Sequence, residues 1–232
     1  MSRPDVAFRS IDRRVTIADQ VFDRLRTELM RCRFEAGHVF SISDLTAQFG
    51  VSRTPVREAL SRLVSEGALR DGTRGEVRVP PIDLAEYRTL CDARAVVEGG
   101  ATALAAQAVG PSDLARLRDL ARVHRQAFDA GQIQDMLDAN AAFHFAVYRA
   151  GRNAMLIGMA ETLWLRAGPY TRLLARLLED RIQSGVSGLY SNHHDRLIDA
   201  LDAGDADKAR GEMIADIRST TDLLLPFFEA EA

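Results

Sequence analysis

The 232-residue sequence has no run of 18 or more uncharged apolar residues, so no segment is predicted to cross a membrane. Its first ten residues carry Arg3, Asp5 and Arg9 in place of the apolar core of a signal peptide. The two cysteines, Cys32 and Cys91, are far apart in sequence and lack C-x-x-C spacing, which argues against a disulfide framework and against a zinc ribbon. We therefore expect a cytoplasmic protein with no membrane partner.

The sequence also lacks the short motifs that carry common enzyme chemistry. It has no H-E-x-x-H pair, no nucleophile elbow and no Gly-rich phosphate loop. What it does have is 47% hydrophobic residues, enough to bury a sizeable core, and a length that suits two modest domains. The formal charge of −3 is unevenly divided, because residues 1–80 carry +3 and the remainder −6. A mildly basic N-terminal segment followed by an acidic remainder is compatible with DNA binding at the N-terminal end.

Three short helices are predicted in the first 80 residues. Apolar side chains recur every fourth position between residues 17 and 34, which is the stripe of an amphipathic helix. A second helix is expected at 43–49, closed by Gly50, and a third from 53 to about 66 after a tight turn. Two helices joined by a Gly-containing turn are typical of a helix-turn-helix.

A small β-hairpin and a stiff linker follow these helices. After the turn-forming sequence at 71–75, charged and apolar side chains alternate over 76–79, which predicts a wing. Pro80-Pro81 can continue neither a strand nor a helix, so the domain boundary is placed there. We expect a DNA-binding domain at 1–80 and an effector-binding and dimerisation domain at 81–232.

The second domain is predicted to be helical throughout. Its periodic segments are separated by glycine-containing breaks and cover 83–108, 111–130, 132–151, 153–178, 182–203 and 205–228. No strand pattern interrupts them. The fold class is therefore predicted to be mainly α, with an N-terminal winged helix-turn-helix followed by an all-helical antiparallel bundle.

The third predicted helix has the pattern of a DNA-recognition helix. Val56, Leu60 and Leu63 share one face, which leaves Arg53 and Arg57 together on another, one turn apart near the helix N-terminus. Arginine can bond guanine in two places in the major groove, and nearby hydroxyl groups can bond phosphates. The alternative is a solvated helix whose two surface arginines pair with a neighbouring carboxylate such as that of Glu58.

The same residues resemble a known family. The run from Phe49 to Leu60 (FGVSRTPVREAL), followed by Leu63, Glu66-Gly67 and Arg74-Gly75, is similar to the winged helix of the GntR family. The resemblance implies that operator DNA is contacted by Ser52, Arg53, Thr54 and Arg57 and by the wing residues Arg74 and Gly75. The chain departs from the family where the second helix opens, because Ser41-Ile42-Ser43 replaces the frequent Ser-Glu-Arg segment. Ser43 is the candidate contact there.

The second domain resembles the FCD ligand-binding domain of the FadR-type branch of that family. Three segments carry the resemblance. Arg94-Ala95-Val96-Val97-Glu98 matches an R-x-x-x-E signature, Asn140-Ala141-Ala142-Phe143-His144 a D-x-x-F-H motif, and the segment from His194 to Leu201 an H-x-x-I-x-x-A-I motif.

A divalent metal site is implied by the second and third segments. Asn140 and His144 lie one helical turn apart, so an oxygen and an imidazole can converge on one cation. By resemblance, His194 matches a further histidine ligand of the family, and Asp216 stands in place of another. The chain therefore offers Asn140, His144, His194 and Asp216 where metal-binding members have an aspartate and three histidines. Zinc suits such ligands best, with nickel or manganese as alternatives. The alternative interpretation is a pair of partly buried histidines whose hydrogen bonds are satisfied within the protein.

By the same resemblance, a small organic acid is the expected effector, with its carboxylate on the cation. Arg94 is a candidate second anchor, although it can instead pair with Glu98 one turn on. Arg166 is a further candidate anchor, with a surface or interface role as the alternative. The remaining histidines, His38, His124 and His193, are expected at the surface.

These features predict a homodimeric transcription regulator that binds a pseudo-palindromic operator. Repression is the default role that the resemblance implies, with the effector controlling DNA affinity. Two other classes remain open from the residues alone. One is a metal-dependent hydrolase that uses the histidine and carboxylate set, and the other is a helical interaction module without a ligand of its own.

Overall fold

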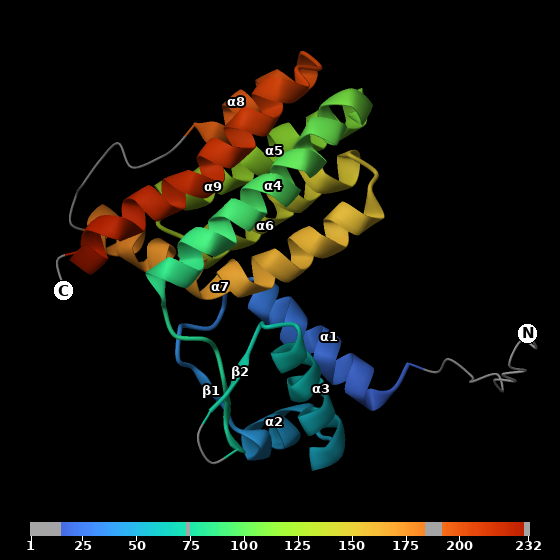
Figure 1. Ribbon diagram of the computed structural model, residues 1–232, viewed down its shortest axis with the longest axis vertical. Coiled ribbons are helices and arrows are strands. Elements are labelled where there is room, and N and C mark those ends of the chain that lie inside the picture. Colours follow the sequence, from blue (N-terminus) through green and yellow to red (C-terminus); the bar gives the residue numbers. More distant parts are fainter. Residues whose placement is uncertain (1–14, 73–74, 184–191, 230–232) are drawn as a thin grey trace, which may run out of the picture.

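The computed structural model describes residues 15–72, 75–183 and 192–229, and it has two parts (Figure 1). A small unit with three helices and three short strands, here called the head, precedes a larger all-helical domain. The mainly α fold class, with a winged helix-turn-helix followed by a helical bundle, is confirmed.

The head contains one helix outside the helix-turn-helix, the two helices of that motif, and a small antiparallel sheet. Its elements are α1 (Ile17–Met30), β1 (Val39–Phe40), α2 (Ile42–Phe49), α3 (Arg53–Ser65), β2 (Arg70–Asp71) and β3 (Val77–Arg78). The strand order is β1-β3-β2, with Val39 opposite Arg78 and Asp71 opposite Val77. The sheet therefore joins the wing hairpin to the segment before α2.

Local chemistry sets the ends of these helices. Ser41 caps α2 by accepting the backbone N–H of Asp44, and Gly50 ends it in the left-handed conformation (φ 65°). The first helix is shorter than the predicted 17–34, because the chain turns at Cys32, which has φ 53°. Strand β1 was not predicted, because two residues are too few to show an alternating pattern.

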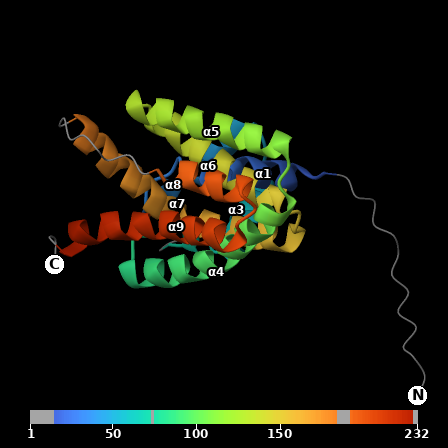
Figure 2. The ribbon, with the colours of Figure 1, turned by 90° about the horizontal axis from the view of Figure 1, so that it is seen from above.

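In the described part of the helical domain, six helices pack into an antiparallel bundle (Figures 1 and 2). They are α4 (Leu84–Ala108), α5 (Pro111–Asp129), α6 (Ile133–Ala150), α7 (Ala154–Gln183), α8 (His193–Asp202) and α9 (Ala206–Glu229). Two predicted segments are corrected. Helix α7 continues past 178 to Gln183, so it includes the first two residues of the segment predicted at 182–203, and the separate helix α8 begins at His193.

Each part has its own apolar core, and one helix contributes to both. The head core gathers side chains of α1, α2, α3 and the strands, and it includes Leu165 of α7. The neighbouring Trp164 of the same helix belongs to the core of the helical domain. Helix α7 therefore links the two cores directly. No helix in the described part of the chain is long and apolar enough to span a membrane.

Candidate functional site

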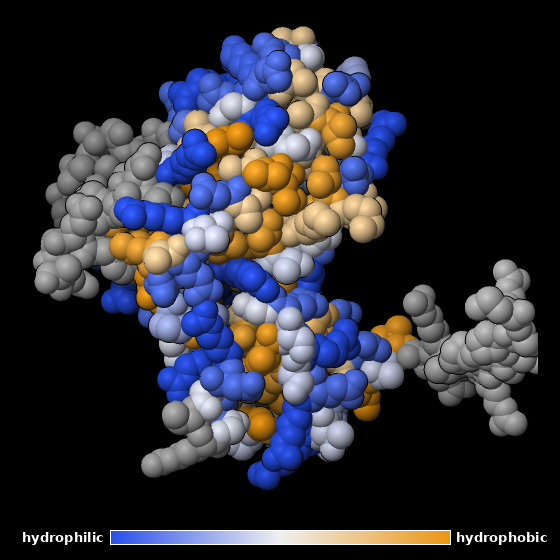
Figure 3. Space-filling model, viewed as in Figure 1, coloured by the Kyte–Doolittle hydropathy of each residue, from blue (hydrophilic) through white to orange (hydrophobic). Residues whose placement is uncertain are grey.

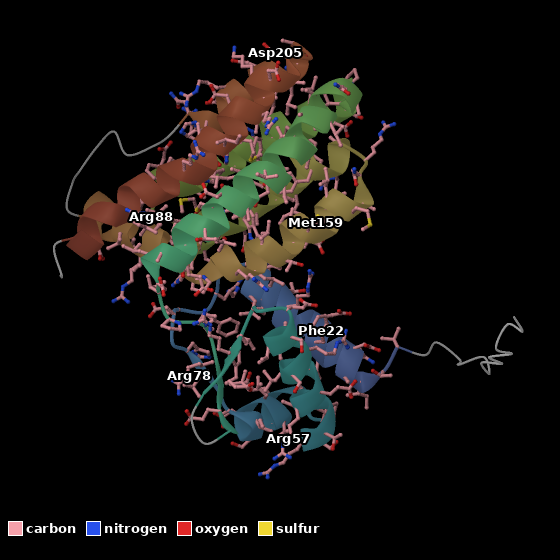
Figure 4. The ribbon with its side chains drawn as sticks, viewed as in Figure 1. Phe22, Arg57, Arg78, Arg88, Met159 and Asp205 are labelled. Carbon is pink, nitrogen blue, oxygen red and sulfur yellow. The ribbon has the colours of Figure 1, made fainter. Side chains whose placement is uncertain are left out.

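The N-terminal end of α3 presents the predicted DNA-contacting side chains to solvent. Ser52 is the N-cap residue, and its hydroxyl makes no capping hydrogen bond. Ser52, Arg53, Thr54 and Arg57 are all exposed, while Val56 behind them is fully buried in the head core. Figure 4 shows Arg57 pointing away from the head at the end remote from the helical domain. The arrangement separates a buried face from a polar face on one helix, as the sequence predicts.

Both arginines of this face keep their side chains exposed to solvent. Among the described residues, no side chain hydrogen-bonds or pairs with Arg53 or Arg57, so the predicted alternative of a salt bridge to Glu58 is not seen. By contrast, Arg62 on the same helix bonds Asp19 at 2.7 Å and lies over the ring of Phe22 at 3.9 Å. The two unpaired guanidinium groups are free to contact phosphates or guanine edges.

Two other predicted contacts flank this surface. Ser43 is exposed in the first turn of α2, where its hydroxyl bonds that of Ser41 at 2.8 Å. Gly75 has φ 78°, and a Cβ placed there would meet nothing, so the wing backbone could approach DNA closely. Arg74 lies outside the described residues.

A second cluster lies inside the helical domain. The side chains of His144 on α6, His194 on α8 and Asp216 on α9 each offer one ligand atom, and these atoms lie within 4.8 Å of one another. Nε2 of His144 is 3.0 Å from Oδ2 of Asp216. The two imidazole rings are 5.4 Å apart between centroids and nearly perpendicular. Helix α6 and the consecutive helices α8 and α9 thus bring together three of the four predicted metal ligands.

Burial shapes the protonation of this cluster. It lowers the pKa of His194 to about 3, because an imidazolium is poorly solvated there, so the ring is neutral. Burial alone would raise the pKa of Asp216, but the hydrogen bond and charge of His144 hold it well below its usual range. Nδ1 of His194 is buried without a hydrogen-bond partner among the described residues. The cluster therefore contains a carboxylate and a ring nitrogen that has no hydrogen-bond partner in the part of the chain that the structure describes.

A series of buried hydrogen bonds begins at the ring nitrogen of His144 that faces away from Asp216. This atom, Nδ1, lies 3.1 Å from the hydroxyl of Tyr148, which in turn donates to the carboxylate of Glu98. Glu98 also accepts two bonds from Arg94, at 2.6 and 3.2 Å. This chain fixes the orientation of the imidazole and connects the cluster to α4.

The remaining predicted site residues take different positions. Asn140 is half-buried one turn before His144 on α6. Arg94 is buried in its ion pair with Glu98, which is the competing role that the sequence left open. Arg166 donates to the backbone oxygen of Glu66 at 3.3 Å, so it lies at the contact between the helical domain and the head. That is the interface role that the sequence left open for Arg166.

Sequence reasoning missed several residues of this site. His124, expected at the surface, packs its ring 4.7 Å from that of His194, and burial lowers its pKa to about 4. Tyr148 could have been found, because it lies one turn after His144 on the same helix. The indole of Trp164, 5.2 Å from the ring of His144, carried no recognisable signal in the sequence.

An exposed helix of a helix-turn-helix, joined to a helical domain with a buried cluster of histidine and aspartate, is typical of one-component transcription regulators. Comparison with known proteins gives the family. Residues 17–79 match the bacterial regulatory proteins of the gntR family, and residues 89–219 match the FCD domain. The chain belongs to the GntR family and carries a C-terminal FCD domain.

Individual relatives agree with this assignment. The chain is 34% identical over 155 residues to the HTH-type transcriptional regulator McbR of Escherichia coli K12, covering 67% of this chain and 70% of that protein. It is 27% identical to a probable D-xylose utilization operon transcriptional repressor of Paenarthrobacter nicotinovorans, covering 84% and 83%. The solved structure of E. coli McbR/YncC superposes with a TM-score of 0.79 at 28% identity, covering 93% of this chain and all of that one.

Membership in this family decides between the classes left open by the sequence. The family and its members are DNA-binding transcription regulators and not enzymes, so the hydrolase alternative is discarded. The chain is a DNA-binding regulator of transcription.

Proposed function

We propose that this regulator is a homodimeric repressor whose operator affinity is controlled by a small carboxylate metabolite, bound at a divalent cation in the helical domain. The observation that carries the proposal is the convergence of His144, His194 and Asp216 in a domain joined to an exposed recognition helix. The relative named as a probable operon repressor supports the direction of control.

The cluster fits a metal cation in three respects. Imidazole and carboxylate groups are the ligands that zinc prefers, and both must be deprotonated to bind it. His194 is neutral at physiological pH, and Asp216 is ionised. The orphaned Nδ1 of His194 gains a partner if the cation is bound by that nitrogen.

The hydrogen-bond chain behind His144 completes this fit. A cation on Nε2 of His144 leaves the proton on Nδ1, which donates to the hydroxyl of Tyr148. Metal-bound histidines usually have such a partner. His144, His194 and Asp216 hold the cation, with Asn140 as the fourth protein ligand, and nickel or manganese are alternatives to zinc.

When bound, the cation supplies positive charge that anchors the carboxylate of the effector. The protein side chains fix where that charge sits. Arg94 is the predicted second anchor. Because two of its N–H groups are already held by Glu98, it offers the effector at most its remaining donors.

The helical domain also offers a surface for a second copy of the chain. Large apolar side chains are exposed on the packed helices α4 and α7, namely Val96 and Leu104 on α4 and Met155 and Met159 on α7. Figure 3 shows apolar residues gathered on this face, and Figure 4 marks Met159 within it. We assign the homodimer contact to this face, because contiguous exposed apolar surface is characteristic of interaction sites. A dimer formed through this face carries two heads, which can bind the two half-sites of one operator.

Selection of binding sequences from a random DNA pool tests the DNA-reading part. The wild-type protein should enrich an inverted repeat, and the double variant Arg53→Ala, Arg57→Ala should enrich nothing. Arg118→Ala, which removes an exposed arginine of α5 paired with Asp202, serves as the matched control and should enrich the same repeat. Enrichment by the double variant would refute the assigned recognition surface.

Metal analysis tests the sensing part. After purification and dialysis against zinc, the wild type should hold about one zinc per chain, and His194→Ala should hold far less. Stoichiometric zinc that leaves operator affinity unchanged with every organic acid screened would refute metal-dependent sensing.

A further inference from the structure

The only tryptophan of the chain, Trp164, lies between the ligand cluster and the head. It belongs to α7 and is almost fully buried. One neighbour is the ring of His144, 5.2 Å away between centroids, and another is the guanidinium of Arg94, 5.3 Å from the indole centroid. The indole therefore contacts the proposed metal ligand and the arginine of the hydrogen-bond chain behind it.

The same indole also makes a hydrogen bond to the head. Its Nε1–H donates to the backbone oxygen of Met30 at 3.1 Å. Met30 is the last residue of α1, and carbonyl groups in the last turn of a helix have no partner within it. The three preceding carbonyls accept backbone N–H groups, whereas that of Met30 accepts the indole and, at 3.9 Å, the thiol of Cys32. Trp164 thus holds the C-terminal end of α1.

The first helix is rigidly tied to the recognition helix. Apolar side chains of α1 and α3 share the head core. Arg62 of α3 bonds Asp19 near the start of α1 and lies over the ring of Phe22. A displacement of the end of α1 therefore moves α3, and with it the exposed Arg53 and Arg57.

We propose that Trp164 is the residue that couples occupancy of the His144, His194 and Asp216 site to the position of the head; this inference rests on the metal site of the proposed function. Binding draws His144 toward the cation and changes its packing against the indole. Because the Nε1–H of the same indole holds the end of α1, the change reaches the recognition helix. The effector acts through the same ring if it engages Arg94.

The first test uses the intact wild-type chain with zinc chloride as the probe. Since Trp164 is the only tryptophan, its emission reports this site without any substitution. Zinc should shift or quench the emission in proportion to the metal bound, and His144→Ala should lose both the zinc and the response. Zinc that binds stoichiometrically with no change in emission would overturn the coupling and leave the metal site intact.

The second test follows the head by hydrogen exchange. Zinc should change the exchange of backbone amides at residues 27–33 in the wild type. In Trp164→Phe, which keeps a ring but loses the N–H donor, zinc should still bind while that change is lost. Arg166→Ala is the matched control, because it removes another α7 contact to the head and should keep the change.

The outcomes separate the two proposals. A zinc-dependent change that persists in Trp164→Phe would overturn the role of Trp164 alone. No zinc binding by the wild type would overturn the metal site itself and the coupling that rests on it. If Trp164→Phe does not fold, the emission of the wild type decides.

Discussion

Arg94, Glu98, Tyr148 and His144 form a continuous buried chain in which each polar group has a partner. Burial and the neighbouring carboxylate of Glu98 raise the pKa of Tyr148 well above its usual value. The hydroxyl therefore stays protonated and donates a hydrogen bond to Glu98. Buried polar networks stabilise a structure only when every member is satisfied. This hydrogen-bonded series is therefore suited to hold His144 in a single orientation.

Removal of one hydroxyl should weaken the metal site without removing a ligand. We expect Tyr148→Phe to bind zinc about tenfold more weakly, because His144 loses the partner that orients it. Zinc titration of the purified protein measures this change. The control is Tyr170→Phe, which loses a hydroxyl bonded to the backbone of Asp83 and should bind zinc as the wild type does. Equal affinities in the two variants would rule out the supporting role of Tyr148.

At the scale of elements, α1 depends on its N-terminal cap. The backbone N–H and the hydroxyl of Thr16 both donate to the carboxylate of Asp19, which also pairs with Arg62 of α3. The bonds from Thr16, followed by that from Arg62, lower the pKa of Asp19 to about 2. One carboxylate thus caps α1 and ties it to the recognition helix.

This cap predicts a pH-dependent loss of stability. Because the folded pKa lies below the unfolded value of about 3.9, the stabilisation is complete above that value and is lost as the pH falls through it toward 2. Asp19→Asn should therefore lower the urea midpoint at pH 7, and its difference from the wild type should shrink in acid. Asp23→Asn, on the same helix, is the control with a nearly unchanged midpoint. A difference that stays constant with pH would contradict this account.

The elements show how far the sequence alone could lead. Long helices such as α4 and α6 were predicted within two residues at each end, because glycine and proline mark their limits. The end of α1 was placed too late, since the positive φ of Cys32 has no signal in the residue type. His144 was recognised by the resemblance of its segment to the D-x-x-F-H motif. The packing of His124 against His194 and of Trp164 against His144 joins different helices, and no periodicity reports it.

At the scale of the whole molecule, the exposed apolar face of α4 and α7 predicts the oligomeric state. The double variant Val96→Asp, Met159→Asp puts charges where the proposed dimer excludes water, so it should be monomeric by light scattering. It should also lose most of its affinity for the inverted repeat, because one head reads one half-site. Val123→Asp, exposed on α5, should remain dimeric. If the double variant is still dimeric, the dimer contact does not lie on this face.

Leu165 gives the architecture a consequence for protein engineering. This side chain of α7 is almost fully buried in the core of the head, more than 80 residues beyond the predicted linker at Pro80-Pro81. A head excised at the linker would keep a hole where Leu165 sits, and lost buried leucine volume typically costs about 2–5 kcal/mol. Chimeric biosensors made by exchanging heads between regulators must therefore match the sensor residue that fills this hole, as well as the linker.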